Sequence, residues 1–297
     1  MLDYPSLVEA LREMFRGGCE APVRHHHDVP GGTLLLMPAW QAGDAAGIKI
    51  VTVFPGNAAR ALPSVQGLYL LLDGATGVPR ALLDGPALTV RRTAAASALA
   101  AHYLARDGGL CHLMVGTGAL APHLIAAHAA LRSVRETRIW GRDPAKAAAL
   151  ARSLAATGMA VQPADDLESA VRAADIVTCA TLARAPLVRG AWLSPGTHLD
   201  LVGGYTPDMR EADDEAVRRA RVYVDTRAGA TKEAGDIVQP LRSGVLAGEG
   251  IVGDLAELAR GEAPGRRGDD EITLFKSVGT ALEDLAAAEL VAERTAG

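Results

Sequence analysis

The stretch that decides the fold is residues 110–121, which read LCHLMVGTGALA. An apolar run of strand length leads into the pattern G-x-G-x-x-A, formed by Gly116, Gly118 and Ala121, and a helical pattern follows. The first glycine permits a tight turn, the second lets the backbone approach a pyrophosphate, and the alanine lets helix and strand pack closely. The free N–H groups at the helix N-terminus favour phosphate. We therefore predict a dinucleotide-binding turn that contacts its cofactor through Gly116, Thr117, Gly118, Ala119 and Leu120.

Strands and helices alternate along the chain from this turn onward. Strands are predicted at residues 110–115, 138–140, 175–180, 198–202 and 222–225, and helices at 119–131, 144–156 and 166–173. Such alternation is typical of a parallel sheet with helices on both faces. The sequence therefore predicts an α/β fold with a Rossmann dinucleotide-binding domain over residues 110–275.

The chain before residue 110 has a different pattern. A helix is predicted at 5–15, strands at 33–37, 48–54, 67–73 and 78–83, and an Ala-rich helix at 94–106. The turn at 73–77 joins two of these strands as a hairpin, which favours an antiparallel or mixed sheet. Residues 272–290 are predicted to form a helix that packs back on this part. We therefore expect a second, mixed α+β domain made of residues 1–109 with 276–297.

Composition and charge exclude several classes of protein. The 297 residues carry 30 Lys and Arg against 35 Asp and Glu, and a net charge of −5 argues against a nucleic-acid binder. No apolar run reaches the roughly 18 residues of a membrane span, and the first residues show no signal-peptide pattern. The three cysteines are far apart and form no paired motif, which fits a reducing compartment. We expect a cytoplasmic protein that binds neither nucleic acid nor membrane.

The end of the second strand of the alternating region bears on the choice between NAD and NADP. It reads IWGRD at residues 139–143. NAD enzymes usually carry an acidic residue here for the ribose hydroxyl, whereas Gly141 leaves room for a 2′-phosphate and Arg142 offers it a positive charge. Asp143 comes one residue late and keeps NAD possible. We expect Gly141 and Arg142 to contact the cofactor, and NADP to be favoured.

Cationic residues stand out in the first domain. Lys49 interrupts an apolar strand, and a buried ammonium needs a partner or a function. Arg91 and Arg92 open the predicted Ala-rich helix, and an arginine at a helix N-terminus makes a good carboxylate site. Each has a plainer interpretation, as a solvent-facing lysine or a surface charge. Arg24 precedes three histidines, but adjacent side chains on an extended segment diverge, so we expect no metal site.

Six short motifs carry a specific resemblance. They are RHHHDVP at 24–30, GIK at 47–49, FPGN at 54–57, RRTAA at 91–95, GTG at 116–118 and FKSVG at 275–279. Together they resemble the ornithine cyclodeaminase/mu-crystallin family over essentially the whole chain. The resemblance implies that the second domain, formed by the N-terminal half and the last helix, binds substrate and mediates dimerisation. It also implies a bound nicotinamide cofactor and a homodimer.

The resemblance also assigns roles to individual residues. Arg24 and Arg92 match the arginines that hold the substrate carboxylate, and Lys49 matches the active-site lysine beside the imine. Thr181 and Val278 match positions close to the nicotinamide, and Asn57 is expected as a further residue of the substrate pocket. These positions match those of the family.

One segment departs from the cyclodeaminases of the family. They carry an aspartate that acts as general base after the fifth Rossmann strand. When Pro207 and Glu211 are aligned with the family's proline and glutamate, Tyr205 stands in place of that aspartate. Asp208 and Glu211 are nearby carboxylates but out of register. The segment resembles instead the branch that reduces cyclic ketimines, such as the pyrroline-2-carboxylate reductases and mu-crystallin.

The chemistry of the two branches makes different demands. A cyclodeaminase needs a base that takes protons from an ammonium group. A ketimine reductase must hold the carboxylate and place an already electrophilic carbon near the hydride donor. We therefore expect an NAD(P)H-dependent reductase of cyclic imino acids, for example of pyrroline-2-carboxylate to proline. The alternatives are an NAD-dependent ornithine cyclodeaminase that forms proline and ammonia, an opine- or alanine-type dehydrogenase, and a non-enzymatic NADP(H)-binding protein.

Overall fold

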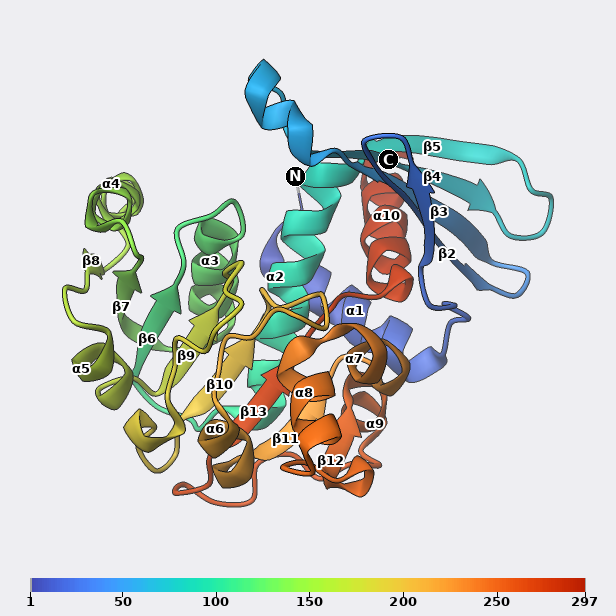
Figure 1. Ribbon diagram of the computed structural model, residues 1–297. Helices are drawn as coiled ribbons and strands as arrows, with labels where there is room; N and C mark the ends of the chain where they lie inside the picture. Colours follow the sequence, from blue (N-terminus) through green and yellow to red (C-terminus); the bar gives the residue numbers. More distant parts are fainter. Residues whose placement is uncertain (1, 297) are drawn as a thin grey trace. The chain divides into compact units, whose positions relative to one another are not determined.

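The computed structural model describes residues 2–296 and divides the chain into two compact units (Figure 1). Unit one comprises Met1–Ala95 with Gly279–Gly297, and unit two comprises Ala96–Val278; Met1 and Gly297 themselves lie outside the described residues. The sequence-based limits were 109/110 and 275/276. The first limit of the structure falls inside a helix instead, and the second falls shortly after a strand.

Unit one is built on a five-stranded antiparallel sheet with the order β1-β2-β3-β4-β5. Its strands are β1 (His25–Val29), β2 (Gly32–Gln41), β3 (Ala45–Val53), β4 (Val65–Asp73) and β5 (Pro79–Asp84). The unit also contains helix α1 (Tyr4–Gly17) before β1, the short 3₁₀ helix η1 (Pro55–Arg60) between β3 and β4, and helix α10 (Ala281–Ala296) at the end of the chain. Helix α10 packs against α1 and against strands β2 to β5. The prediction that the last helix packs on this part of the chain is therefore confirmed, as are the four predicted strands.

Helix α1 shows how local signals set an element. Asp3 precedes it, and its side chain accepts a hydrogen bond from the backbone N–H of Ser6, while Pro5 occupies the first turn. Gly18 ends the helix with a φ of 84°, which glycine adopts without strain. The buried side chains, including Leu7 and Leu11, share one face, so the predicted amphipathic helix is confirmed.

Helix α2 (Gly85–Leu104) corrects one expectation. The predicted helix began at residue 94 with the two arginines at its opening, but the observed helix begins nine residues earlier. The carboxylate of Asp84 accepts a hydrogen bond from the backbone N–H of Ala87 at 2.8 Å, as a capping residue does, and Pro86 lies in the first turn. Arg92 therefore lies within the helix, and the dipole of the helix N-terminus makes no contribution to a carboxylate site there.

Unit two contains an eight-stranded sheet with the order β12-β11-β13-β10-β9-β6-β7-β8, in which every pairing is parallel. The strands are β6 (Leu110–Val115), β7 (Val134–Trp140), β8 (Val161–Pro163), β9 (Ile176–Cys179), β10 (His198–Leu201), β11 (Arg221–Val224), β12 (Ile251–Asp254) and β13 (Thr273–Lys276). The helices are α3 (Ala121–Leu131), α4 (Pro144–Ala155), α5 (Leu167–Arg172), α6 (Asp214–Arg219), α7 (Arg227–Glu233), α8 (Gly235–Ser243) and α9 (Leu255–Arg260), with 3₁₀ turns at Gly190–Trp192 and Gly248–Gly250. The predicted α/β class and Rossmann domain are confirmed.

Strand β13 corrects a second expectation. Residues 272–290 were predicted to be one helix, but residues Thr273–Lys276 form a strand between β10 and β11, and the helix starts only at Ala281. All four residues of β13 are buried, so the strand lacks the alternation that marks a half-exposed strand. Gly279, with a φ of 80°, separates the two elements. In the part of the chain that the structure describes, no helix has the length and apolar character needed to cross a bilayer.

Candidate functional site

The predicted dinucleotide turn joins β6 to α3. Gly116 has a φ of 122°, and a Cβ there would lie 2.5 Å from the carbonyl oxygen of Ala180, so only glycine fits. A Cβ on Gly118 would meet no atom within 4 Å, which leaves open space in front of the helix. Thr117, Ala119 and Leu120 complete the turn, and α3 begins at the following residue. This open space beside a helix N-terminus fits the pyrophosphate of a dinucleotide.

The end of strand β7 lies against this turn. A Cβ on Gly141 would come within 2.8 Å of Cγ2 of Thr117, so the residue after the strand packs on the glycine loop. Arg142 is exposed. The carboxylate of Asp143 caps helix α4 by accepting hydrogen bonds from the backbone N–H groups of Ala145 at 3.0 Å and Lys146 at 3.4 Å. The acidic residue nearest to the end of β7 is therefore bonded to the helix that follows it.

Thr181 lies two residues after the carboxyl end of β9, and Val278 lies two residues after the carboxyl end of β13. The backbone N–H of Val278 donates to Oδ2 of Asp225 at 2.7 Å. The carboxyl ends of parallel strands meet at one edge of a sheet, so these residues share an edge with Gly116. Unit two thus brings the predicted cofactor residues to a single edge.

A buried ionic network that was not predicted supports this edge. Oε1 of Glu211 accepts hydrogen bonds from the backbone N–H and the hydroxyl of Thr181, at 2.7 and 2.8 Å, and Oε2 accepts from the N–H of Gly203 at 2.7 Å. Asp236 accepts from the N–H of Glu211 at 2.8 Å, and Nζ of Lys276 lies 3.2 Å from Oδ2 of Asp236. Burial raises the pKa of the Glu211 carboxyl. The network ties the loop after β9 to the loop after β10.

Tyr205 lies in the loop after β10, and its side chain is 45% exposed. The carboxylate of Asp208 in the same loop is exposed and accepts a hydrogen bond from the hydroxyl of Thr206, while it pairs with Arg184 at 3.1 Å. The placement of Tyr205 where cyclodeaminases carry an aspartate stays a prediction from the sequence.

Unit one brings Lys49 and Arg92 together around two carboxylates of α10. Nζ of Lys49, on β3, lies 2.9 Å from Oδ1 and 2.8 Å from Oδ2 of Asp284, and donates to the hydroxyl of Thr89 at 3.3 Å. Arg92, on α2, donates from Nε to Oδ1 of Asp284 at 2.9 Å and from Nη1 to Oε2 of Glu283 at 2.6 Å. The side chains of Glu283 and Asp284 are 0% exposed. We call these four charged residues the buried ionic cluster.

Arg24 joins this group, and Asn57 does not. Nη2 of Arg24 donates to the carbonyl oxygen of Gly279 at 2.7 Å, and the guanidinium of Arg92 lies so close to Gly279 that a Cβ there would collide with it. Asn57 lies in η1, where its side chain donates to the carbonyl oxygen of Pro63 at 3.0 Å, a bond that holds the η1 loop. Three of the four predicted residues of the substrate site are therefore neighbours.

The electrostatics of the cluster follow from its burial. Burial and the positive charge of Arg92 both lower the pKa of Lys49, and the carboxylate of Asp284 opposes them, so the pKa lies at about 8. Burial alone would raise the pKa of Asp284, but Arg92 and Lys49 hold it below its ordinary value. An ammonium with a pKa close to neutrality is able to give up a proton to a substrate.

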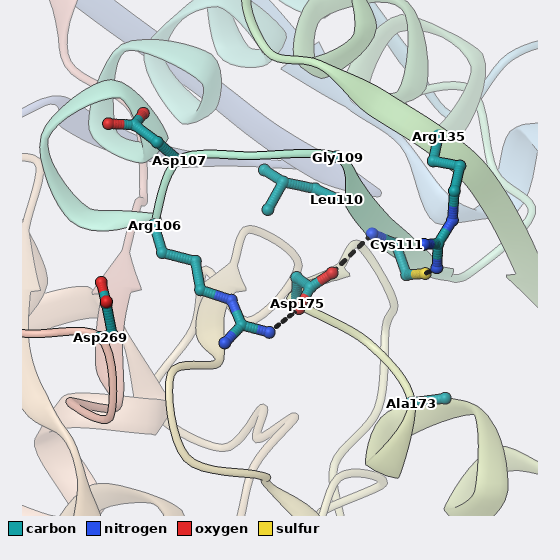
Figure 2. A pocket seen from close by; sticks show the side chains of 9 residues that line it. All are labelled: Arg106, Asp107, Gly109, Leu110, Cys111, Arg135, Ala173, Asp175 and Asp269. Atoms are coloured by element: carbon teal, nitrogen blue, oxygen red, sulfur yellow. Dashed lines mark hydrogen bonds and ion pairs between the residues drawn. The ribbon is translucent and has the colours of Figure 1, made fainter.

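A polar pocket of about 490 Å³ lies elsewhere in unit two, at the amino ends of β6 and β9 (Figure 2). Arg106 forms an ion pair with Asp175 on its wall, and Asp175 accepts a hydrogen bond from the backbone N–H of Cys111 at 2.7 Å. Dinucleotides bind beyond the carboxyl ends of the strands in such sheets. The pocket is therefore at the wrong end of the sheet for the cofactor.

The three consecutive histidines lie on the exposed strand β1. Among residues 2–296, no group of three or more His, Cys, Asp or Glu side chains is placed to hold a metal ion. The structure thus offers the histidines no common ligand site within the residues it describes.

Comparison with known proteins places these features in a family. The model of the ornithine cyclodeaminase/mu-crystallin family matches residues 3–297. A Delta(1)-pyrroline-2-carboxylate reductase of Paracoccus denitrificans is 41% identical over 301 residues, which cover 100% of this chain and 94% of the relative.

Two solved structures share the fold over almost the whole chain. The Thermococcus litoralis Delta(1)-pyrroline-2-carboxylate reductase, in complex with NADH and L-proline, has a TM-score of 0.94 and 34% identity, with 99% of this chain and 94% of that chain covered. An archaeal alanine dehydrogenase dimer with bound NAD has a TM-score of 0.93 and 30% identity, with 99% and 92% covered. The chain belongs to the ornithine cyclodeaminase/mu-crystallin family.

Proposed function

We propose that this chain is an NAD(P)H-dependent oxidoreductase that reduces the C=N bond of a cyclic imino acid, such as pyrroline-2-carboxylate to proline. The observation that carries the proposal is the buried ionic cluster of unit one with Arg24 beside it. Arg24, Lys49 and Arg92 bring three cationic side chains together, and α10 supplies two carboxylates to them. The single positive charge in excess suits a ligand with one carboxylate.

Arg24 and Arg92 are the proposed carboxylate ligands. The bonds of Arg92 to α10 use Nε and Nη1, and a guanidinium has five N–H donors. Donors therefore remain for a substrate, in the fork geometry that matches a carboxylate. Gly279 supports both arginines, since its carbonyl oxygen accepts from Arg24 and its missing side chain leaves room for Arg92.

Lys49 is the proposed proton donor. The nicotinamide, when bound, supplies the hydride that the imine carbon receives. As that carbon is reduced, the electron pair of the C=N bond moves to the nitrogen, which takes a proton from Nζ of Lys49. The neutral amine of Lys49 then regains a proton from solvent. A pKa of about 8 makes the ammonium the main form at neutral pH while keeping the transfer easy.

The same charge balance disfavours ornithine cyclodeamination. Ornithine carries two ammonium groups and one carboxylate at neutral pH, so it would add positive charge to a cluster that already has an excess. The exposed side chain of Tyr205 also provides no carboxylate base. Cyclodeamination therefore remains the alternative that a substrate panel must exclude.

NADP is the proposed preferred cofactor. Arg142 is exposed two residues after the end of β7, and the carboxylate of Asp143 caps α4, which leaves the positive side chain to meet a 2′-phosphate. The residues proposed to hold the dinucleotide are Gly116, Thr117, Gly118, Ala119, Leu120, Gly141, Arg142, Thr181 and Val278. A KM for NADH below that for NADPH would contradict the preference.

A homodimer is proposed from an uncovered face of the sheet in unit one. Lys49 points to α10, so its strand neighbours Ile48 and Ile50 point to the opposite face. Ile50 pairs with Leu68, and Ile48 is joined through β4 to Leu82, whose side chain is 68% exposed. A patch of this kind marks an interaction surface, and the related archaeal alanine dehydrogenase is a dimer. Light scattering at the mass of a 30.8 kDa monomer would overturn the proposal.

The location of the protein remains a proposal too. All three cysteines are free, the state that a reducing compartment maintains, and we propose the cytoplasm.

The test of the proposed function is oxidation of NADPH and NADH with a panel of substrates. We expect turnover with pyrroline-2-carboxylate and piperideine-2-carboxylate, and little or no reduction of NAD with ornithine or alanine. Turnover with ornithine and release of ammonia would make the chain a cyclodeaminase. Tight binding of NADPH without oxidation by any imine would favour a non-enzymatic binding protein.

A further inference from the structure

One carboxylate in unit one bridges two cations. Oδ1 of Asp284 accepts from Nζ of Lys49 and from Nε of Arg92, both at 2.9 Å. These three side chains come from β3, α2 and α10, and all three are buried. An ammonium and a guanidinium that share one buried carboxylate would repel each other strongly in its absence, because low-dielectric surroundings screen charges poorly. Asp284 thus determines whether both cations stay together and charged.

The neighbouring carboxylate, that of Glu283, pairs with a different cation. Glu283 is equally buried, but its ion pair is with Nη1 of Arg92, while both oxygens of Asp284 lie within 3 Å of Nζ of Lys49. Besides Arg92, the other charged group that acts on Lys49 is Arg24. Tyr69 is the register partner of Lys49 between β3 and β4, and its phenol feels the charge of Asp284. Asp284 is therefore the carboxylate that acts on Lys49.

The bonds of Lys49 also leave it a donor. An ammonium has three N–H groups, and the hydrogen bonds of Nζ go to Asp284 and to the hydroxyl of Thr89. Thr89 is itself fixed, because its hydroxyl donates to the carbonyl oxygen of Gly85 at 2.8 Å. Two fixed acceptors orient the ammonium, so the remaining N–H has a defined direction.

We propose that Asp284 is a positioning residue for imine reduction: it keeps Lys49 protonated and oriented beside Arg92, so that Lys49 donates the proton while Arg92 binds the substrate carboxylate. This inference rests on the proposed function, since it assigns Lys49 the role of acid. It adds that the acid strength of Lys49 is set by a residue more than two hundred positions away in the chain. Asp284 itself need not touch the substrate.

The variant Asp284→Asn tests this role through the pH profile of kcat. Without the negative charge, Lys49 faces Arg92 and Arg24 uncompensated and loses its proton at lower pH. Because the reaction needs the protonated form, the alkaline fall of kcat moves to lower pH, and kcat at pH 8 drops roughly 10- to 100-fold. The KM for the imino acid does not rise, because the site has gained positive charge. A purely structural role would raise KM and leave the pH profile in place.

Glu283→Gln is the matched control. It removes a negative charge from the same turn of α10, but from the carboxylate that pairs with Arg92 rather than Lys49. We expect a change in KM with the alkaline limb near its wild-type position. Equal shifts of the limb in both variants would overturn the assignment to Asp284, as would an unchanged limb in Asp284→Asn.

Two further measurements cover misfolding and failure of the proposed function. Asp284→Glu keeps the charge and should restore most of the pH profile if the asparagine variant does not fold; failure to do so in a folded protein would contradict the proposal. A ¹³C NMR titration of the Lys49 side chain, in wild type and variant, reports ionisation without turnover. A lower pKa in the variant, in a protein that reduces no imine, would refute the proposed function and leave the control of Lys49 by Asp284 standing.

Discussion

Both units of the molecule bury a lysine next to an aspartate, yet the two clusters are built differently. In unit one, the carboxylate of Asp284 accepts hydrogen bonds from two cationic side chains, Lys49 and Arg92. In unit two, Asp236 and Glu211 accept mainly from backbone N–H groups, and Lys276 lies beside them. A carboxylate whose oxygens already accept hydrogen bonds from backbone N–H groups fixes a loop and has few lone pairs left for a ligand. A carboxylate that pairs with cationic side chains orients those side chains, and their remaining N–H donors are available to a ligand.

The largest difference between the clusters is expected from Arg92→Ala. The change removes the charge-assisted bonds to a substrate carboxylate and should cost kcat/KM about 2–5 kcal/mol, which is a loss of about 30-fold or more. Steady-state kinetics measure the loss, which should fall mainly on the KM for the imino acid. Arg91→Ala is the control, since the neighbouring arginine on α2 donates to the carbonyl oxygen of Leu2 instead. An unchanged KM would remove Arg92 from the site.

The unit-two network should respond in stability rather than in substrate binding. In Glu211→Gln the amide can accept at only one end, so the N–H of Gly203 or of Thr181 loses its acceptor. The expected cost is about 1–3 kcal/mol of unfolding free energy, and Tm should fall by roughly 3–10 °C. The KM for the imino acid should move far less than with Arg92→Ala. Glu215→Gln, which disrupts an exposed pair with Arg218, should leave Tm unchanged. An unchanged Tm in Glu211→Gln would contradict the stabilising role of the unit-two network.

A smaller effect is expected from pH. Burial, with the nearby His128, lowers the pKa of His112 and of His198 well below that of a free histidine. The unfolded chain therefore takes up protons below about pH 6.5 that the folded chain excludes, and stability falls as the pH drops. The loss is at most about 1.4 kcal/mol per pH unit for each histidine. Urea unfolding at pH 7.5 and 5.5 measures it, with exposed His25→Gln as control; a flat profile would refute it.

The parts of the site that could be predicted from the sequence are the local ones. The glycine turn lies within one short stretch, and a lysine inside an apolar strand stands out by itself. The charge of Arg92 is also visible in the sequence, but the predicted helix places it at the opening, whereas α2 begins at Gly85 and holds Arg92 in its interior. The informative signal was Asp84 followed by Gly85 and Pro86, which caps and opens the helix.

The partners of these residues could not be predicted. Glu283 and Asp284 read as ordinary acidic residues in the first turn of a helix, where the dipole favours them. Their role depends on contacts with residues that lie about 190 to 235 positions away, and no local pattern encodes such contacts. Strand β13 was missed for a related reason, because a fully buried central strand shows no alternation that would distinguish it from a helix.

The position of α10 also sets an order of events during synthesis. Unit two is one continuous segment, Ala96–Val278, and can complete its sheet while the chain is still emerging from the ribosome. The sheet of unit one, though translated first, must wait for the last helix, because only then do Asp284 and Glu283 arrive to neutralise Lys49 and Arg92. Nascent chains halted before α10 will therefore hold a sheet that lacks its covering helix, with Lys49 and Arg92 not yet paired with their carboxylates. They are the natural clients of a chaperone.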